Sequence, residues 1–270
     1  MAFLERQLKR LLLTLLVVFS TFTFTAAEPV RSGNVEAELI SSSASPQAGE
    51  EFWVGVVLRP DEHWHTYWRN PGDTGLATTV EWTAPAGVTV SELHWPFPSV
   101  YDDGGLVSYV YEDEVVLLAK VTVSPEWQEG AGFELRAKVN WLACKEACVL
   151  GKADLSLGFP TDSSQSLASA AERLPDSIPV SATAEWLNDS QIKLRVQNPA
   201  LESVEGAYFF SIPDLAVEPS APQSFERLED GFTLTLVKSQ TNPAKPESLD
   251  GVLVVEQGGQ KRAFRITTEL

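Results

Sequence analysis

The chain has 270 residues, of which 37 are acidic and 20 basic, so its formal net charge at pH 7 is −17. Nucleic acid is not an expected partner, because phosphate binding relies on clusters of Lys and Arg and this sequence has no basic run. A soft copper site is disfavoured too, since the only methionine is the initiator. The acidic surface instead favours solubility and steering of protein partners.

The first 27 residues have the pattern of a secretory signal peptide. Lys9 and Arg10 precede an apolar run at 11–19, and small residues stand before an expected cleavage near Ala27. The run is shorter and more interrupted than a membrane span, although an uncleaved anchor is the alternative. Cleavage removes one acid and three bases, which brings the net charge from −17 to −19. We therefore expect an exported chain in a compartment where disulfides persist.

Residues 28–162 read as short strands separated by turns. The clearest strand is 133–141, in which apolar residues alternate strictly with polar ones, as expected when one face lies on a core and the other in water. A tight turn is predicted at 70–75, which contains Asn, Pro and Gly. Strands at this spacing predict a β-sandwich. The further predicted strands are 51–58, 78–82, 88–93, 115–123 and 153–157.

Residues 163–179 are predicted to be a linker with a short helix, capped by Ser164 or Ser166 and stopped by Pro175. A second sandwich is predicted for residues 180–270. It has no cysteine and no histidine, so we expect it to be a structural or docking module. Its predicted strands are 182–187, 191–197, 207–212, 232–237, 251–257 and 262–268. The predicted fold class is thus all-β, with two sandwich domains in tandem.

The two cysteines, Cys144 and Cys148, follow the 133–141 strand and precede Gly151. A disulfide between them would close a five-residue loop, worth roughly 2 kcal/mol, and a domain of this size can bury a sufficient core without it. A structural disulfide, a redox-active pair and a metal site all remain open. The position at a strand turn favours redox chemistry. Strand alternation places Cys144 on the outward face, unless a bulge resets the register.

A metal site would need further ligands, and His63 and His65 are candidates to complete a tetrahedral set with two thiolates. His-x-His is a weak signal, because histidines among aromatic residues more often pack or form hydrogen bonds. We therefore expect no metal and no cofactor. The surrounding aromatic residues are expected in the core, with a platform around the cysteines or for partner docking as the alternative. These residues are Trp64, Tyr67, Trp68, Trp82 and Trp95.

Three segments together resemble the N-terminal periplasmic domain of the DsbD/ScsB family of thiol:disulfide interchange proteins. They are HWHTYWRNPGDTGLATTVEW from His63, YEDEVVLLAKVTV from Tyr111 and NWLACKEACVLGKADLSL from Asn140. The block YWRNPGD within the first segment is similar to the ScsB-like branch. The resemblance runs from about Val35 to the C-terminus, and it is most specific in the first sandwich.

The resemblance implies a periplasmic, immunoglobulin-like domain with thiol:disulfide oxidoreductase activity. Its electron donor would be a membrane-embedded thiol reductase, and its acceptors would be periplasmic thioredoxin-like or disulfide isomerase proteins. These serve cytochrome c biogenesis or copper tolerance. In related domains the second cysteine makes the intermolecular bond, which would assign Cys148 to the partner and Cys144 to resolution. The alternative is a non-catalytic envelope binding module, for copper or for an envelope protein, with a structural disulfide.

The sequence departs from the pattern of this family in two respects. DsbD covers its cysteines with a short loop that has an aromatic tip, whereas the corresponding segment here, 100–106, carries Gly104 and Gly105. Tyr101 or Tyr109 is the candidate to take over the shielding. Longer members also continue into membrane and thioredoxin domains, so we expect a separate electron donor or a chain that is a fragment.

Overall fold

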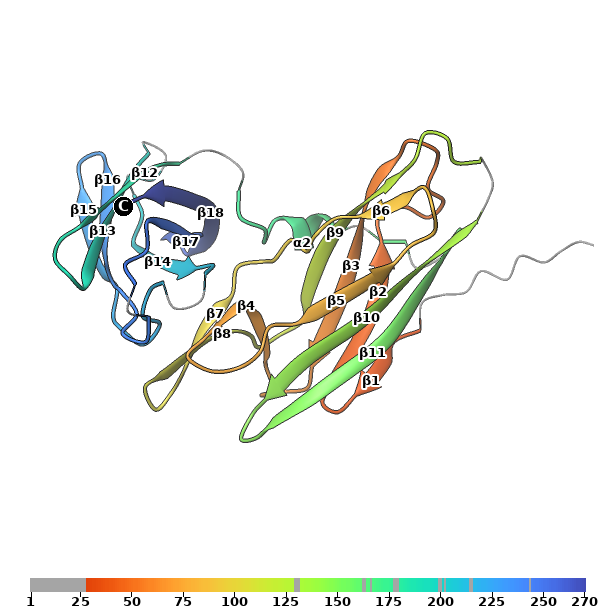
Figure 1. Cartoon of the computed structure of the whole chain (residues 1–270), viewed down its shortest axis with the longest axis horizontal. Coiled ribbons are helices and arrows are strands. Elements are labelled where there is room, and N and C mark those ends of the chain that lie inside the picture. Colours follow the sequence, from red (N-terminus) through yellow and green to blue (C-terminus); the bar gives the residue numbers. More distant parts are fainter. Residues whose placement is uncertain are drawn as a thin grey trace, which may run out of the picture.

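The computed structural model describes residues 28–128, 132–161, 164–165, 167–176, 180–198, 201, 203–213, 216–242 and 244–270. Nearly all regular structure in them is strand, which confirms the all-β prediction. Two β-sandwiches follow one another along the molecule, with the short helix α2 (Ala168–Ala171) between them (Figure 1). The expected leader, 1–27, lies outside the described residues. None of the helical segments among the described residues has the length and hydropathy of a transmembrane span.

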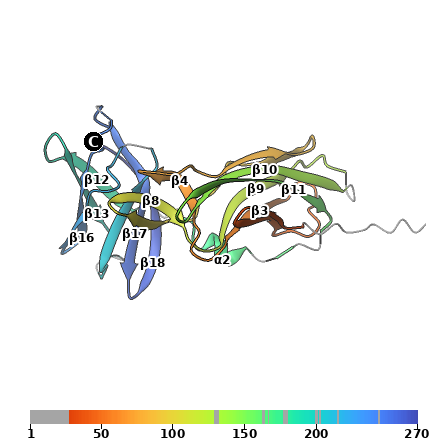
Figure 2. The same ribbon diagram turned by 90° about the horizontal axis from the view of Figure 1, so that it is seen from below.

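The first sandwich consists of two antiparallel sheets that face each other across one core (Figure 2). The larger sheet has the order β1 (Val30–Ser32), β2 (Val35–Ser41), β3 (Glu51–Pro60), β9 (Val115–Val123) and β6 (Val88–Val90). The smaller one has the order β11 (Cys148–Phe159), β10 (Phe133–Cys144) and β5 (Thr79–Thr83). The alternation predicted for 133–141 is confirmed: every second residue is buried in the core and those between are exposed.

A third, smaller sheet lies at one end of the first sandwich. It has the order β4 (Thr66–Gly72), β8 (Leu106–Tyr111) and β7 (Ser99–Asp103). The tight turn predicted at 70–75 is wrong at its start, because Asn70 and Pro71 belong to β4. Proline is accommodated there since the β4–β8 register shifts between Tyr67 and Gly72, where a missing amide hydrogen costs no ladder bond.

The second sandwich has a core of its own. One sheet has the order β12 (Ser181–Trp186), β13 (Gln191–Gln197), β16 (Gly231–Val237) and β15 (Ser224–Leu228). The other has the order β14 (Gly206–Ser211), β17 (Ser248–Gln257) and β18 (Gln260–Glu269). All six strands predicted for this half are present, and β15 was missed.

The connection between the sandwiches is packed against the first of them. Helix α2 begins after Leu167 and has no side-chain cap, so the cap predicted at Ser164 is wrong; Ser166, the other candidate, lies outside the described residues. Leu167 and Leu174 join an apolar cluster on the outer face of the larger sheet. This cluster holds the segment from Leu167 to Leu174 against the first sandwich.

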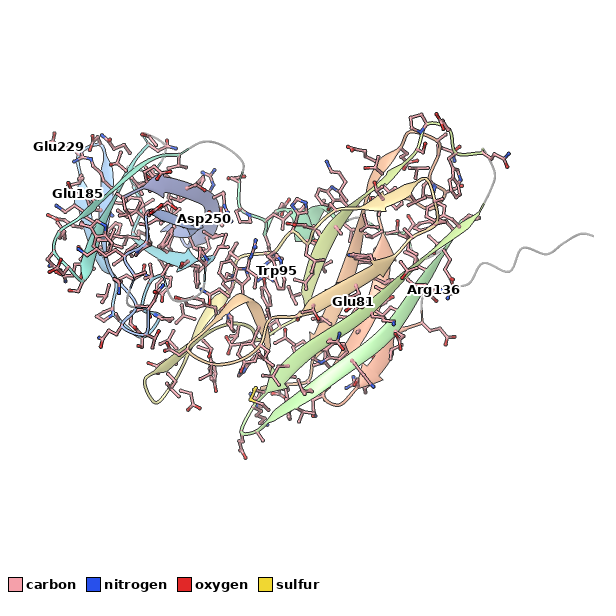
Figure 3. The ribbon with its side chains drawn as sticks, viewed as in Figure 1. Glu81, Trp95, Arg136, Glu185, Glu229 and Asp250 are labelled. Atoms are coloured by element: carbon pink, nitrogen blue, oxygen red, sulfur yellow. A yellow bond between two sulfur atoms is a disulfide. The ribbon has the colours of Figure 1, made fainter. Side chains whose placement is uncertain are left out.

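The two sandwiches share an apolar junction. Phe210 on β14 lies edge-on to Trp68 on β4 and Tyr109 on β8, with ring centroids 6.0 and 4.9 Å away. Asn70 Nδ2 donates a hydrogen bond of 2.8 Å to the Ser211 carbonyl. Figure 3 shows the side chains that fill the space between the two bodies, where Trp95 is labelled. The second sandwich therefore buries the β4–β8 strands on the side facing it.

Candidate functional site

The two cysteines close the hairpin formed by β10 and β11. They are the last residues in register on the two strands, and a disulfide joins them. Three residues, 145–147, form an exposed turn beyond the bond. The disulfide lies at this end of the hairpin in Figure 3. Cys144 is only 4% exposed, whereas Cys148 is exposed. One cysteine of the pair is therefore far more exposed than the other.

The burial of Cys144 comes from a neighbouring strand and not from the sandwich core. The β10–β11 register is continuous, so no bulge resets it, and Cys144 lies on the face opposite to Ala143, which is in the core. The predicted outward parity is thus present. This end of the outer face is covered because β4 begins next to it: His65 N donates to the Cys144 carbonyl and Cys144 N donates to the His65 carbonyl, both at 3.0 Å.

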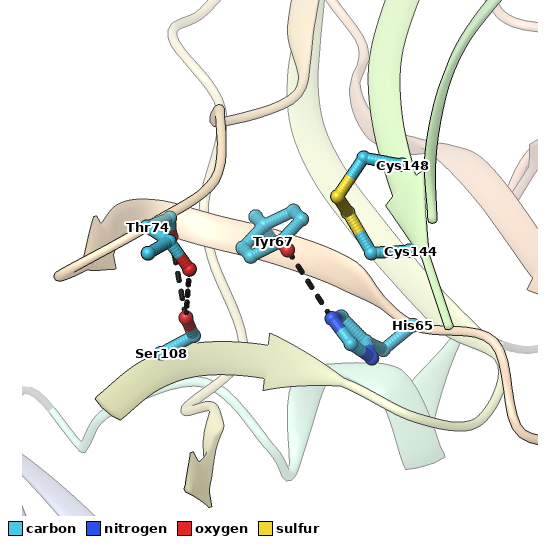
Figure 4. The surroundings of a disulfide bond; sticks show 6 residues. All are labelled: His65, Tyr67, Thr74, Ser108, Cys144 and Cys148. Atoms are coloured by element: carbon cyan, nitrogen blue, oxygen red, sulfur yellow. Dashed lines mark hydrogen bonds between the residues drawn. A yellow bond between two sulfur atoms is a disulfide. The ribbon is translucent and has the colours of Figure 1, made fainter. Parts of the chain in front are cut away.

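Aromatic side chains cover the disulfide (Figure 4). Tyr67 packs with Cys144, and His65 Nε2 lies 3.2 Å from the Tyr67 hydroxyl. The ring of Tyr101 lies 4.6 Å from the His65 ring. Of the two tyrosines considered for shielding, Tyr101 is at the site, while Tyr109 belongs to the junction between the sandwiches. The remaining apolar neighbours of Cys144 in this cluster are Val110 and Leu142.

The segment after β4 holds Tyr67 in place. Gly75 has a φ of +105°, and a Cβ atom built on it would lie 2.1 Å from the Tyr67 ring. Only glycine fits both the backbone conformation and the contact. Thr74 is tied to β8 by a hydrogen bond of 2.8 Å between its hydroxyl and that of Ser108. The Asn-Pro-Gly-Asp-Thr-Gly segment therefore supports the aromatic cover of the disulfide.

The site contains an uncharged imidazole at neutral pH. Burial lowers the pKa of His65, because the surroundings disfavour its charged form. Burial likewise raises the pKa of Tyr67. A cavity of about 630 Å³ opens beside His65 and Tyr101. Its lining is otherwise largely acidic, with Asp61, Glu62, Glu112, Asp113 and Glu114.

The two candidate histidines have different surroundings. His63 is exposed in a backbone conformation with φ 67°, and its ring lies 3.4 Å from Glu62. His65 is buried at the disulfide. Among the residues that the structure describes, no group of three or more His, Cys, Asp or Glu is placed to hold a metal ion. The set of two thiolates and two histidines considered from the sequence is therefore not formed.

An apolar edge adjoins the exposed sulfur. Val149 and Leu150 follow Cys148 on β11 and are 41% and 73% exposed. Exposed apolar residues next to a reactive group are typical of a contact surface for another protein. This edge could be predicted from the sequence, since VL directly follows the second cysteine.

The proximity of His65 and Tyr67 to the cysteines was not predicted, although the sequence contains a signal for it. Residues two apart in extended backbone point to the same face, so His65, just before β4, and Tyr67 share one face while Trp68 lies on the other. Trp68 is in the main core, as predicted, and Tyr67 belongs to the cluster at the disulfide. The alternative of an aromatic platform around the cysteines thus applies to Tyr67.

Comparisons with known proteins agree with this architecture. Residues 35–160 match the family model described as thiol:disulfide interchange protein DsbD, N-terminal. The crystal structure of the N-terminal periplasmic domain of ScsB from Proteus mirabilis is similar, with a TM-score of 0.64 and 19% identity over 87% of this chain and 94% of that chain. A chimeric titin Z1Z2 aligns over 91% of this chain and 98% of that chain with 10% identity, but its TM-score is 0.18.

A search of the curated proteins found no match. The family match spans both cysteines and the strand that covers them, and the ScsB domain shares the fold of both sandwiches. The resemblance noted in the sequence is therefore confirmed, since residues 35–160 match the family model of DsbD N-terminal domains.

Proposed function

We propose that this chain is a periplasmic thiol:disulfide oxidoreductase component. It takes electrons from a membrane-embedded thiol reductase and passes them to thioredoxin-like or disulfide isomerase proteins through Cys144 and Cys148. The observation that carries the proposal is the difference between the two cysteines, one exposed and one buried, in a domain that matches the DsbD N-terminal family. Their placement at a hairpin end leaves room for a partner.

The exposure difference supports a division of roles between the cysteines. Thiol–disulfide exchange requires a thiolate to reach a sulfur of the partner, followed by attack of a second thiol on the mixed disulfide. Cys148 is the sulfur that a partner can reach, and Cys144 lies directly opposite it in the hairpin. Cys148 then forms the intermolecular bond and Cys144 resolves it.

The surfaces around the two cysteines are proposed to bind the partner protein. The apolar edge of Val149 and Leu150 contacts the partner next to the reacting sulfur. The acidic surface steers partners that present basic groups, an effect that salt weakens. The redox chemistry resides in residues 28–162, and residues 180–270 hold the site in place or extend the docking surface.

The experiment is a transfer assay with the mature chain, residues 28–270. The chain is reduced and freed of reductant, mixed with an oxidised, purified thioredoxin-like protein, and quenched with an alkylating reagent that adds mass to each thiol. Rapid reduction of the acceptor is expected, and Cys148→Ala should abolish it. No transfer to any thioredoxin-fold acceptor would instead support an envelope binding module with a structural disulfide.

A further inference from the structure

We propose that His65 is the general base that deprotonates Cys144 when this cysteine attacks the mixed disulfide. The inference rests on the proposed exchange function and assigns a residue to its second step.

The backbone fixes His65 next to Cys144. The two residues exchange both of their amide hydrogen bonds, at 3.0 Å each, which makes them a directly opposite antiparallel pair. In such a pair the side chains lie on the same face, with Cβ atoms about 4.5–5.5 Å apart. Figure 4 shows the imidazole ring beside the disulfide, on the same side as Tyr67. The ring therefore lies on the same face of the strand pair as the Cys144 side chain.

The resolving thiol needs a base. Cys144 is buried with Tyr67 and Val110, and apolar surroundings disfavour the thiolate, which is the attacking form of a cysteine. Lys145 is the nearest cation in the sequence, but it lies in the exposed turn. Cys148 is exposed and meets its partner in water, so it has no comparable need. Because Cys144 is buried and Cys148 is exposed, Cys144 is the cysteine that needs a base.

The imidazole is prepared for that task. Nε2 interacts with the Tyr67 hydroxyl at 3.2 Å, and the Tyr101 ring packs on the imidazole. Within the described part of the chain, Nδ1 has no hydrogen-bond partner. The proposed role requires the tautomer in which Nε2 carries the hydrogen and donates it to the Tyr67 hydroxyl, because only then is Nδ1 the nitrogen that can accept a proton. The lowered pKa of His65, which its burial causes, keeps the ring in the neutral, basic form.

The cavity beside His65 provides a route by which the proton can leave to solvent. The cavity of about 630 Å³ is lined by His65 and Tyr101, and the carboxylates of Asp61, Glu112 and Glu114 share it. Water in this cavity can take the proton from the imidazolium. Asp61 and Glu114 are paired with Arg31 and Arg59, and Arg59 lines the same cavity. Proton transfer at Cys144 is thereby linked to solvent through the cavity beside His65.

The resolving step can be written in full. In the mixed disulfide, Cys148 is bonded to a partner sulfur and Cys144 is a thiol. His65 takes the Cys144 proton, and the thiolate attacks the Cys148 sulfur. The Cys144–Cys148 bond forms, the bond to the partner breaks, and its electron pair leaves on the partner thiolate. The imidazolium then returns the proton to water or to that thiolate, so the partner has gained two electrons.

A two-phase assay separates this step from the first. The reduced mature chain is mixed with one equivalent of 5,5′-dithiobis(2-nitrobenzoate). Release of the first thionitrobenzoate reports the mixed disulfide on Cys148, and release of the second reports attack by Cys144. For His65→Gln we expect the second phase to slow by about 10-fold or more, with the first phase unchanged. The matched control is His63→Gln, an exposed neighbour, which should leave both phases at the wild-type rates.

Two further variants keep the test decisive. In His65→Ala, added imidazole should restore the second phase through the adjoining cavity, which a purely structural role of His65 would not allow. Tyr67→Phe keeps the ring but removes the hydroxyl that orients the imidazole, and it should slow the second phase by a smaller factor. An unchanged second phase in folded His65→Gln, or in Tyr67→Phe if the histidine variants do not fold, would overturn the inference. Absence of a second phase in the wild type would instead contradict the proposed exchange function.

Discussion

Replacing Phe210 by alanine tests whether the second sandwich holds the strand that covers the disulfide. Phe210 is 3% exposed, and its ring lies 4.6 Å from Tyr208, 4.9 Å from Tyr109 and 6.0 Å from Trp68. Removing a buried Phe side chain costs about 3–5 kcal/mol in a well-packed core. The two sandwiches can move together and close part of the space that the Phe210 side chain leaves. We therefore expect a loss of stability at the lower end of this range, about 3 kcal/mol. Urea unfolding followed by tryptophan fluorescence measures it.

The same substitution should alter the chemistry of the disulfide. Trp68 and Tyr67 are neighbours on β4, so loosening Trp68 also loosens the aromatic cover over Cys144. Each 1.4 kcal/mol lost from the free energy that keeps this cover closed raises the population of molecules with an uncovered disulfide about tenfold. We therefore expect dithiothreitol to reduce the disulfide several-fold faster in Phe210→Ala.

The matched control is Phe225→Ala. Phe225 packs on Phe232, at 5.3 Å, in the second sandwich's own core. It should lower stability without changing the rate of disulfide reduction. If Phe210→Ala is destabilised but its disulfide is reduced at the wild-type rate, β4 is held independently of the second sandwich and the reasoning fails. A loss below about 1 kcal/mol would show that the junction is not closely packed.

Three further predictions concern the cysteines and His65. Cys148→Ala should abolish transfer to a thioredoxin-like acceptor, whereas Cys144→Ala should accumulate the mixed disulfide on non-reducing gels; equal trapping by both variants would reject the assigned roles. Cys144→Ser/Cys148→Ser should stay folded and lose about 2 kcal/mol, and loss of its β-sheet circular dichroism at ambient temperature would favour a structural disulfide. Burial lowers the pKa of His65 from 6.5, so the unfolded chain binds the proton more tightly and stability falls as the pH drops below about 6.5. His65→Gln should therefore lose less stability between pH 7 and 5 than the wild type, and equal losses in urea unfolding would contradict this.

Strands with strong local signals could be predicted from the sequence. Strand β9 (Val115–Val123) and strand β13 (Gln191–Gln197) have the predicted bounds, and the alternation of 133–141 gave the correct buried face of β10. Strands β4, β7 and β8 were missed. They are short, and β4 contains Asn, Pro and Gly, which are typical of turns. Their sheet is held by pairing between distant segments and by the second sandwich, neither of which leaves a local pattern.

The cysteine pair at the site could be predicted from the sequence, but the residues that surround it could not. The two cysteines, their position at a hairpin end and the outward parity of Cys144 all follow from local sequence. Burial of Cys144 does not, because His65 reaches it from a strand far away in the sequence. The spacing of His65 and Tyr67 was a usable signal that these side chains share a face. It could not show which group they face, since that depends on a long-range pairing.

The measurement that tests the central claim most directly is the redox potential of the mature chain. The protein is equilibrated with mixtures of reduced and oxidised glutathione, and the fraction of disulfide is read from alkylated samples by mass. An electron carrier requires a potential near the thioredoxin range, about −270 mV, and this is the result that we expect. A potential below about −300 mV, at which the bond resists the glutathione pool, would mark the Cys144–Cys148 disulfide as structural and contradict the proposed exchange.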